Sequence, residues 1–218
     1  MKKNIAMTVL ALTTGVGLVH AEECQLPPQQ ANSPRTEALS KELSKTNACK
    51  TVKGISAKSL KTVWLALLDT KSTGGKRFET PPPMGTPTGK VFALGDKVPF
   101  DVSAVAQEGL VSLTVTAEGT GKALKLPQYV AGQALLIEKM QPGTSYNWIL
   151  VTRKETYRGS FEIPEADELQ EMNGKLTELD AQGLSSDVKA IYQAAIFEEA
   201  DYYFNRDMIL ASLRNGKK

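Results

Sequence analysis

The fold is decided by two neighbouring stretches, Ser145-Tyr-Asn-Trp-Ile-Leu-Val151 and Tyr157-Arg-Gly-Ser-Phe-Glu-Ile163. Side chains alternate between the two faces of a strand, so Tyr146, Trp148 and Leu150 would share one face of the first stretch. We therefore predict two β-strands, with Trp148 in the core between them and whatever packs against them.

These strands close a block of short alternating segments that covers residues 91–163. About seven strands separated by turn residues fit into it, a density that is typical of a small antiparallel sandwich. The other predicted strands are Val91–Leu94, Val98–Val102, Leu110–Thr116, Ala123–Leu126 and Ala134–Glu138. The block is thus predicted to be an Ig-like β-sandwich, which is a scaffold and does not define an activity.

Helical spacing of apolar residues appears on both sides of this block. Before it, Ser33-Pro34 opens a predicted helix that runs to about Thr46. The run Ser59–Asp69 fits one helical face, with Trp64 as a packing anchor, although a strand over Thr62–Leu68 is an alternative. After the block, three helices are predicted, over Glu165–Leu179, from Ser185 or Ser186 onward, and from Asn205 onward.

The predicted fold class is α+β: an Ig-like sandwich followed by a C-terminal helical hairpin, with a disulfide-stapled N-terminal segment. The predicted organisation is a signal peptide at 1–21, an N-terminal helical segment at 22–75, a Pro/Gly linker at 76–90, the sandwich at 91–163 and C-terminal helices at 164–218. The linker carries three consecutive prolines and is expected to lie extended over the sandwich edge.

The N-terminus has the pattern of a secretory signal: Lys2 and Lys3, an apolar run, and Val19-His20-Ala21 as a cleavage site. Cleavage predicts a periplasmic or secreted protein without stable membrane insertion. It also leaves 24 Lys+Arg against 24 Asp+Glu, because the whole chain has 26 and 24. A balanced charge argues against a dedicated nucleic-acid-binding protein.

His20 is the only histidine, and it leaves with the signal peptide. The mature chain would then have no imidazole for a catalytic triad, a metal site or a pH switch. We expect no cofactor, no metal centre and no catalytic residue.

Two cysteines remain, Cys24 and Cys49. In an exported protein an even count predicts a disulfide, and this one would close a loop worth about 3 kcal/mol. A pair of redox thiols is the alternative, but the Cys-x-x-Cys spacing is missing.

Charge is distributed unevenly along the chain. Residues 35–97 have a net charge of +7, and residues 162–201 have a net charge of −9. The two regions could attract each other within one molecule or between copies, although solvated surface charge is the simpler interpretation.

Three motifs resemble an exported bacterial family of unknown function that is frequent in cyanobacteria. They are Phe78-x-x-Pro-Pro-x-x-Gly-x-Pro-x-Gly89, Pro142-Gly-x-x-Tyr-x-Trp148 and Tyr192-x-Ala-Ala-Ile-Phe-Glu-Glu-Ala-Asp201. The resemblance implies a Phe-Pro-Gly linker, an Ig-like sandwich and a short C-terminal helical pair. This chain departs from the family after Gly89, where a glycine-rich tract is replaced by Lys90-Val-Phe-Ala-Leu-Gly95. The family supplies no catalytic residues.

The predicted function is a non-catalytic interaction or scaffold module of the cell envelope, with another envelope protein as partner. Its candidate interaction surface is formed by Tyr202, Tyr203, Phe204 and Met208, because large apolar residues are unusually dense there. Internal packing of the same residues is the alternative. A second alternative is a carboxylate-based hydrolase or a divalent-cation-binding protein that uses Glu198, Glu199 and Asp201.

Overall fold

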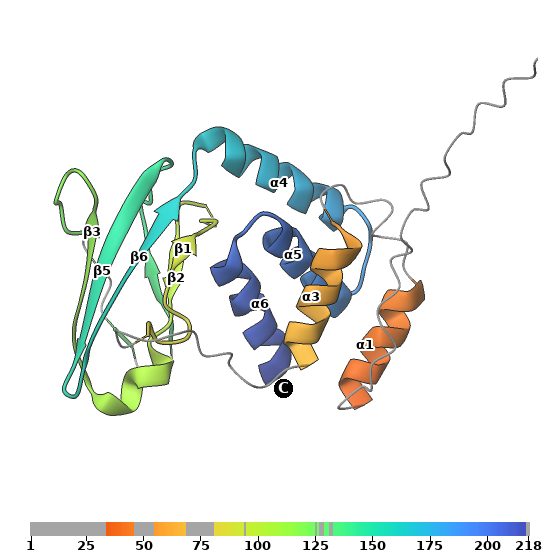
Figure 1. Ribbon diagram of the computed structural model, residues 1–218, viewed down its shortest axis with the longest axis horizontal. Helices are drawn as coiled ribbons and strands as arrows, with labels where there is room; N and C mark the ends of the chain where they lie inside the picture. The colour runs from red at the N-terminus through yellow and green to blue at the C-terminus, as the bar shows by residue number, and fades with distance from the viewer. Residues whose placement is uncertain are drawn as a thin grey trace, which may run out of the picture.

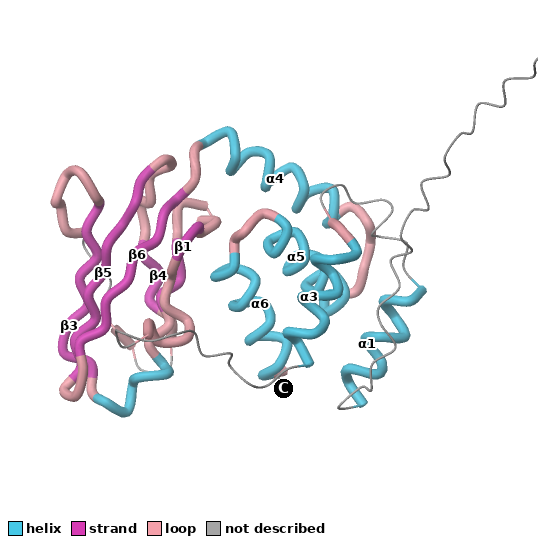
Figure 2. Tube along the Cα trace, viewed as in Figure 1, coloured by secondary structure: helices cyan, strands magenta, loops and turns pink. Residues whose placement is uncertain are grey.

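The computed structural model describes residues 34–45, 55–68, 81–93, 95–124, 126, 129–130 and 133–216. Within these ranges the protein is α+β, as predicted, with strands gathered on one side and helices on the other (Figure 2). The predicted signal peptide and the predicted Cys24–Cys49 bridge lie outside the described residues.

The β side of the molecule consists of two sheets. The larger has four strands in the order β1-β6-β5-β3, and the smaller pairs β2 with β4 in antiparallel fashion. The strands are β1 (Gly89–Lys90), β2 (Val98–Phe100), β3 (Leu110–Ala117), β4 (Leu135–Ile137), β5 (Thr144–Thr152) and β6 (Thr156–Ile163); a short 3-10 helix, η1 (Ser103–Glu108), precedes β3.

The two sheets enclose one apolar core, which we call the β core. Trp148 of β5 is 1 % exposed at its centre, and its ring meets Phe100 of β2 edge-on with centroids 5.2 Å apart. Gly159 lies opposite Trp148 on β6, and any side chain there would collide with the indole. The predicted core position of Trp148 is therefore confirmed.

Two details of the predicted sheet were wrong. The described residues of the strand predicted at Val91–Leu94 are not in a strand; the two-residue β1 comes just before them and runs parallel to β6. It ends there because the backbone of Phe92 is bonded by the side chain of Asn205 and leaves the ladder. In the region predicted as Ala123–Leu126, the described residues form one bridge, Thr116 to Ala123. The Ig-like topology stays a prediction.

The described part of the predicted linker does not simply extend over the edge of the sheets, because some of its residues are buried and hydrogen-bonded. Thr86 is buried, and the carbonyl of Pro87 accepts a hydrogen bond from the Trp148 indole at 2.8 Å. Gly85 has φ of 90° and lies against Asp101 so closely that a side chain would not fit. Thr86 and Pro87 are thus buried within this part of the linker, while several of its other residues stay exposed.

The described helices match the predicted ones closely. They are α1 (Pro34–Lys45), α3 (Ala57–Leu68), α4 (Ala166–Asp180), α5 (Ser186–Glu199) and α6 (Tyr203–Asn215). The helix predicted over Ser59–Asp69 is confirmed for its described residues and the alternative strand over Thr62–Leu68 is wrong; Trp64 is a packing anchor at 1 % exposed. Over the described ranges, no helix is both long and apolar enough to cross a membrane.

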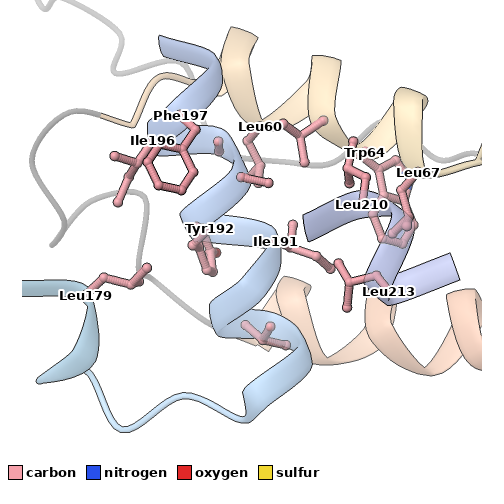
Figure 3. Close-up of a cluster of buried hydrophobic side chains, with 14 of the residues drawn as sticks. Leu60, Trp64, Leu67, Leu179, Ile191, Tyr192, Ile196, Phe197, Leu210 and Leu213 are labelled. Carbon is pink, nitrogen blue, oxygen red and sulfur yellow. The ribbon is translucent and has the colours of Figure 1, made fainter. Parts of the chain in front are cut away.

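The helices share a second core, which we call the helical core. It combines Leu60, Trp64 and Leu67 from before the sheets with residues from after them (Figure 3). The later contributors include Leu179, Ile191, Tyr192, Ile196, Phe197, Leu210 and Leu213. The predicted N-terminal helical segment and the predicted C-terminal helices therefore share one core and do not form two separate units.

Helix α6 joins the two cores. Phe204 belongs to the β core and Met208 packs against it, while Leu210 and Leu213 belong to the helical core. On the same helix, Asn205 is buried and bonds both the N–H of Phe92, at 2.8 Å, and its carbonyl, at 2.9 Å. The side chain thereby replaces a neighbouring strand at the β1 edge of the sheet.

The uneven charge is partly paired within the molecule. Lys90 on β1 bonds Glu168 on α4 at 2.7 Å, and Arg35 on α1 bonds Asp187 on α5 at 3.0 Å. Each pair joins the basic region 35–97 to the acidic region 162–201, so the intramolecular interpretation of the charge pattern holds for these residues.

Candidate functional site

The predicted interaction surface lies at the corner where α5 ends and α6 begins. Helix α5 ends at Glu199, Ala200 caps it, and Asp201 takes a positive φ of 63°, which aspartate tolerates better than most residues. The N–H of Tyr202 then bonds back to the carbonyl of Phe197 at 2.9 Å. This tight reversal sends Tyr202 and Tyr203 in different directions.

The structure corrects the surface predicted from four residues. Tyr202 is 0 % exposed and belongs to the helical core, and Phe204 is 6 % exposed and belongs to the β core. Met208 is partly buried against the β core because it lies one turn after Phe204 on the same face. The internal-packing alternative therefore holds for these three residues, and Tyr203, at 47 % exposed, is left on the surface.

Tyr203 is held in place by its neighbours. Its hydroxyl donates to Asp201 Oδ1 at 2.5 Å, and the guanidinium carbon of Arg206 lies 5.0 Å from its ring centroid. The hydrogen bond to Asp201 raises the pKa of Tyr203 above its ordinary value of 10.0. One ring face is thus covered by a cation while the residue as a whole stays half exposed.

Arg206 is fixed in turn by two carboxylates. Its guanidinium bonds Glu198, one residue before the end of α5, and Asp207 at 2.7 Å. Burial opposes the charge on the guanidinium, but the two carboxylates outweigh that effect and raise its pKa. We call Glu198, Asp201, Tyr203, Arg206 and Asp207 the α5–α6 corner.

The three acids of the predicted cation site do not converge. Glu198 bonds Arg206, Glu199 accepts a hydrogen bond from Ser56 at 2.5 Å, and Asp201 accepts one from Tyr203. Among the residues that the structure describes, no group of three or more His, Cys, Asp or Glu side chains is placed to hold a metal ion. Helical geometry explains the divergence, because adjacent residues on a helix point about 100° apart.

Next to the corner lies a partly buried polar contact that joins three elements. The hydroxyl of Tyr202 donates to Glu168 Oε1 at 3.0 Å, and the ammonium of Lys90 bonds the same oxygen. Lys90 Nζ also lies 5.3 Å from the Tyr202 ring centroid. These bonds connect β1, α4 and the start of α6, so Tyr202 supports the corner from inside.

Sequence reasoning missed the parts played by Asn205 and Arg206. Their only signal is position: both are polar residues within an apolar run that begins at Tyr202. A polar residue inside a buried run must find partners, but nothing in the pattern says that Asn205 meets the backbone of Phe92. That partner lies 113 residues earlier in the chain.

Comparison of the chain with known proteins leaves it without an assigned family. No family model matches it, and neither the curated proteins nor the solved structures contain a match. The resemblance to the exported family of unknown function is therefore still a prediction.

Proposed function

We propose that this protein is a non-catalytic interaction module of the bacterial cell envelope that meets another envelope protein through the α5–α6 corner. The observation that carries the proposal is Tyr203, a half-exposed aromatic side chain held by Asp201 and Arg206. A side chain that is already ordered loses little conformational entropy on binding. Tyrosine and arginine are also among the residues that contribute most at protein interfaces.

The proposed localisation rests on the sequence. The signal-peptide pattern at residues 1–21 and the even cysteine count agree on an oxidising compartment. We propose that the mature chain is periplasmic or secreted and that Cys24 and Cys49 form a structural disulfide. The Ig-like character of the β side belongs to the same proposal, since such modules commonly serve as scaffolds.

A second prediction from the sequence, a carboxylate-based hydrolase or cation-binding protein, gains no specific observation in its favour. The acids of the predicted cation site are engaged by Arg206, Ser56 and Tyr203.

The test is affinity capture from envelope extract with the mature protein as bait. Tyr203→Ser should remove the captured partner while changing the free energy of unfolding by less than about 0.5 kcal/mol, as is usual for a surface substitution. Val111→Ser is the matched control, because Val111 is also an exposed apolar residue but lies on β3.

The result that would overturn the proposal is equal capture by the wild type, Tyr203→Ser and Val111→Ser. A large loss of stability in Tyr203→Ser would instead assign Tyr203 to internal packing.

A further inference from the structure

The described part of the predicted linker begins with three consecutive prolines and a methionine, Pro81-Pro-Pro-Met84, which we call the proline segment. Pro81 and Pro82 are exposed, and Met84, at 67 %, is the most exposed large apolar side chain among the described residues. The segment is part of no helix or strand. It therefore presents a short apolar surface to solvent.

The far end of the proline segment is fixed to the β side of the molecule. The carbonyl of Pro83 accepts hydrogen bonds from the N–H of Thr86, at 3.2 Å, and from its hydroxyl, at 2.7 Å. The carbonyl of Gly85 accepts a hydrogen bond from the N–H of Asp101 at 2.9 Å. The chain then runs into β1, at the edge of the larger sheet that faces the helices (Figure 1). The exposed prolines are thus attached directly to an ordered turn.

The conformation of the segment follows from the chemistry of proline. Each ring fixes φ near −65°, and a residue that precedes a proline is restricted to extended backbone of the polyproline II type. Pro81 and Pro82 both precede a proline. A ligand whose backbone is already confined in this way loses little conformational entropy on binding.

The hydrogen-bonding groups of the segment narrow the kind of partner that fits it. Its three prolines have no backbone N–H, so a partner strand cannot form a regular ladder with them. Within the described residues, the carbonyls of Pro81 and Pro82 accept no hydrogen bond. A fitting partner therefore donates to carbonyls and covers proline rings, which is how grooves lined by aromatic residues bind polyproline II segments.

The protein contains an example of this chemistry a few residues further along the same stretch. The indole N–H of Trp148 donates to the carbonyl of Pro87 at 2.8 Å, and both residues are buried. An aromatic donor thus binds the proline carbonyl at the buried end of the stretch, whereas the proline carbonyls at its exposed end have no such donor in the described part of the chain.

We propose that the proline segment is a polyproline II ligand that binds a groove lined by aromatic residues on a partner protein. The rings of Pro81 and Pro82 pack on the aromatic side chains, and their carbonyls accept hydrogen bonds from indole or phenol groups. Met84 extends the apolar contact at the anchored end. The segment shares no residue with the α5–α6 corner, and the proposal does not depend on the function proposed for that corner.

The test is affinity capture with the purified full chain as bait and a detergent extract of whole cells, so that the result does not depend on the proposed localisation. Pro81→Ala combined with Pro82→Ala removes both rings and frees the backbone. Pro142→Ala is the matched control, because Pro142 is an exposed proline outside the segment. Bound proteins are eluted either with a polyproline peptide or with a glycine–serine peptide of the same length.

A protein retained by the wild type and by Pro142→Ala should be released by the polyproline peptide and not by the glycine–serine peptide. The double proline variant should retain it at least about tenfold less, as expected when a central anchor of an interface is lost. Met84→Ser should weaken retention severalfold, and neither change should move the urea midpoint. The intrinsic fluorescence of the released protein should change when the polyproline peptide is added, because its aromatic groove is then filled.

Three results would overturn the proposal. One is equal retention by the wild type and the double proline variant, and another is the lack of any protein that the polyproline peptide releases selectively. The third is a released protein whose fluorescence does not respond to the peptide. Equal retention by the wild type and Met84→Ser would contradict the contact assigned to Met84, even if the double proline variant were destabilised.

Discussion

The β core and the helical core are built from the chain in opposite ways. Apart from Phe204, the buried residues of the β core come from one continuous stretch, residues 91–163, and two of its longest strands, β5 and β6, are consecutive in the chain and pair with each other. The helical core brings α1 and α3 from before that stretch together with α4, α5 and α6 from after it. The β part is thus inserted into a helical part, whose contacts close long loops and pay a correspondingly larger entropic cost during folding.

Each core contains one of the two tryptophans, which makes the comparison testable. Trp148 lies in the β core and Trp64 in the helical core. A variant that lacks one indole keeps the other as a fluorescent reporter for the opposite core. Because α6 contributes side chains to both cores, we expect a substitution that destabilises one core to lower the stability of the other as well.

The largest expected effect is that of Trp148→Ala. The change leaves a cavity between Phe100 and Gly159 and removes the hydrogen bond to the Pro87 carbonyl. It should lower the free energy of unfolding by about 3–5 kcal/mol, measured in urea with Trp64 as reporter. A change below about 1 kcal/mol in the free energy of unfolding reported by Trp64 would mean that the two cores unfold independently.

Trp64→Ala is the mirror experiment and should cost somewhat less, about 3 kcal/mol, because Trp64 is as buried as Trp148 but Trp148→Ala also removes the hydrogen bond to the Pro87 carbonyl. The reporter is now Trp148. If the two cores unfold as one unit, the transition at Trp148 moves to lower urea together with the helical circular dichroism signal. An unmoved transition at Trp148 would show instead that the inserted β part is stable on its own.

This contrast also explains which features the sequence predicts. Trp148 alternates with Tyr146 and Leu150 on a strand whose partner follows it directly, so the local pattern contains the packing. The helical stripe around Trp64 predicts a buried face but does not name the helices that cover it. The structure supplies that answer from α5 and α6, more than 100 residues later.

The candidate surface failed as a prediction for the same reason. A dense apolar run from Tyr202 to Met208 predicts burial or binding, and the choice depends on what surrounds it. Here the run lies between two cores, so Tyr202 turns into one and Phe204 into the other. Among the aromatic residues of this run only Tyr203 is exposed.

A smaller effect is expected from Asn205→Ala, which acts on the joint between the cores. The change leaves the buried N–H and carbonyl of Phe92 without their partner, and each unsatisfied group costs about 1–3 kcal/mol. We expect a loss of about 2–3 kcal/mol and, more specifically, a separation of the Trp64 and Trp148 transitions. Exchange of the Phe92 amide proton, followed by NMR, should accelerate in parallel; unchanged exchange would contradict the role given to Asn205.

The smallest expected effect is that of Tyr202→Phe, which removes one hydroxyl from the same joint. Losing its hydrogen bond to Glu168 should cost about 1 kcal/mol at neutral pH. Burial of the phenol, together with that hydrogen bond, raises the pKa of Tyr202 well above its ordinary value of 10.0. The raised pKa means that the folded protein keeps the phenol protonated where the unfolded chain would ionise it.

The sign of the pH dependence follows from that difference. Below about pH 10 the phenol is neutral in both states, and the stabilisation is complete. Above pH 10 the unfolded tyrosine loses its proton while the folded one does not, so the free energy of unfolding falls by up to about 1.4 kcal/mol per pH unit until the folded pKa is reached. Tyr202→Phe removes this contribution, so the difference in stability between wild type and variant should shrink and then reverse between about pH 10 and 11. Equal alkaline slopes for the wild type and Tyr202→Phe would show that Tyr202 is not buried at the joint.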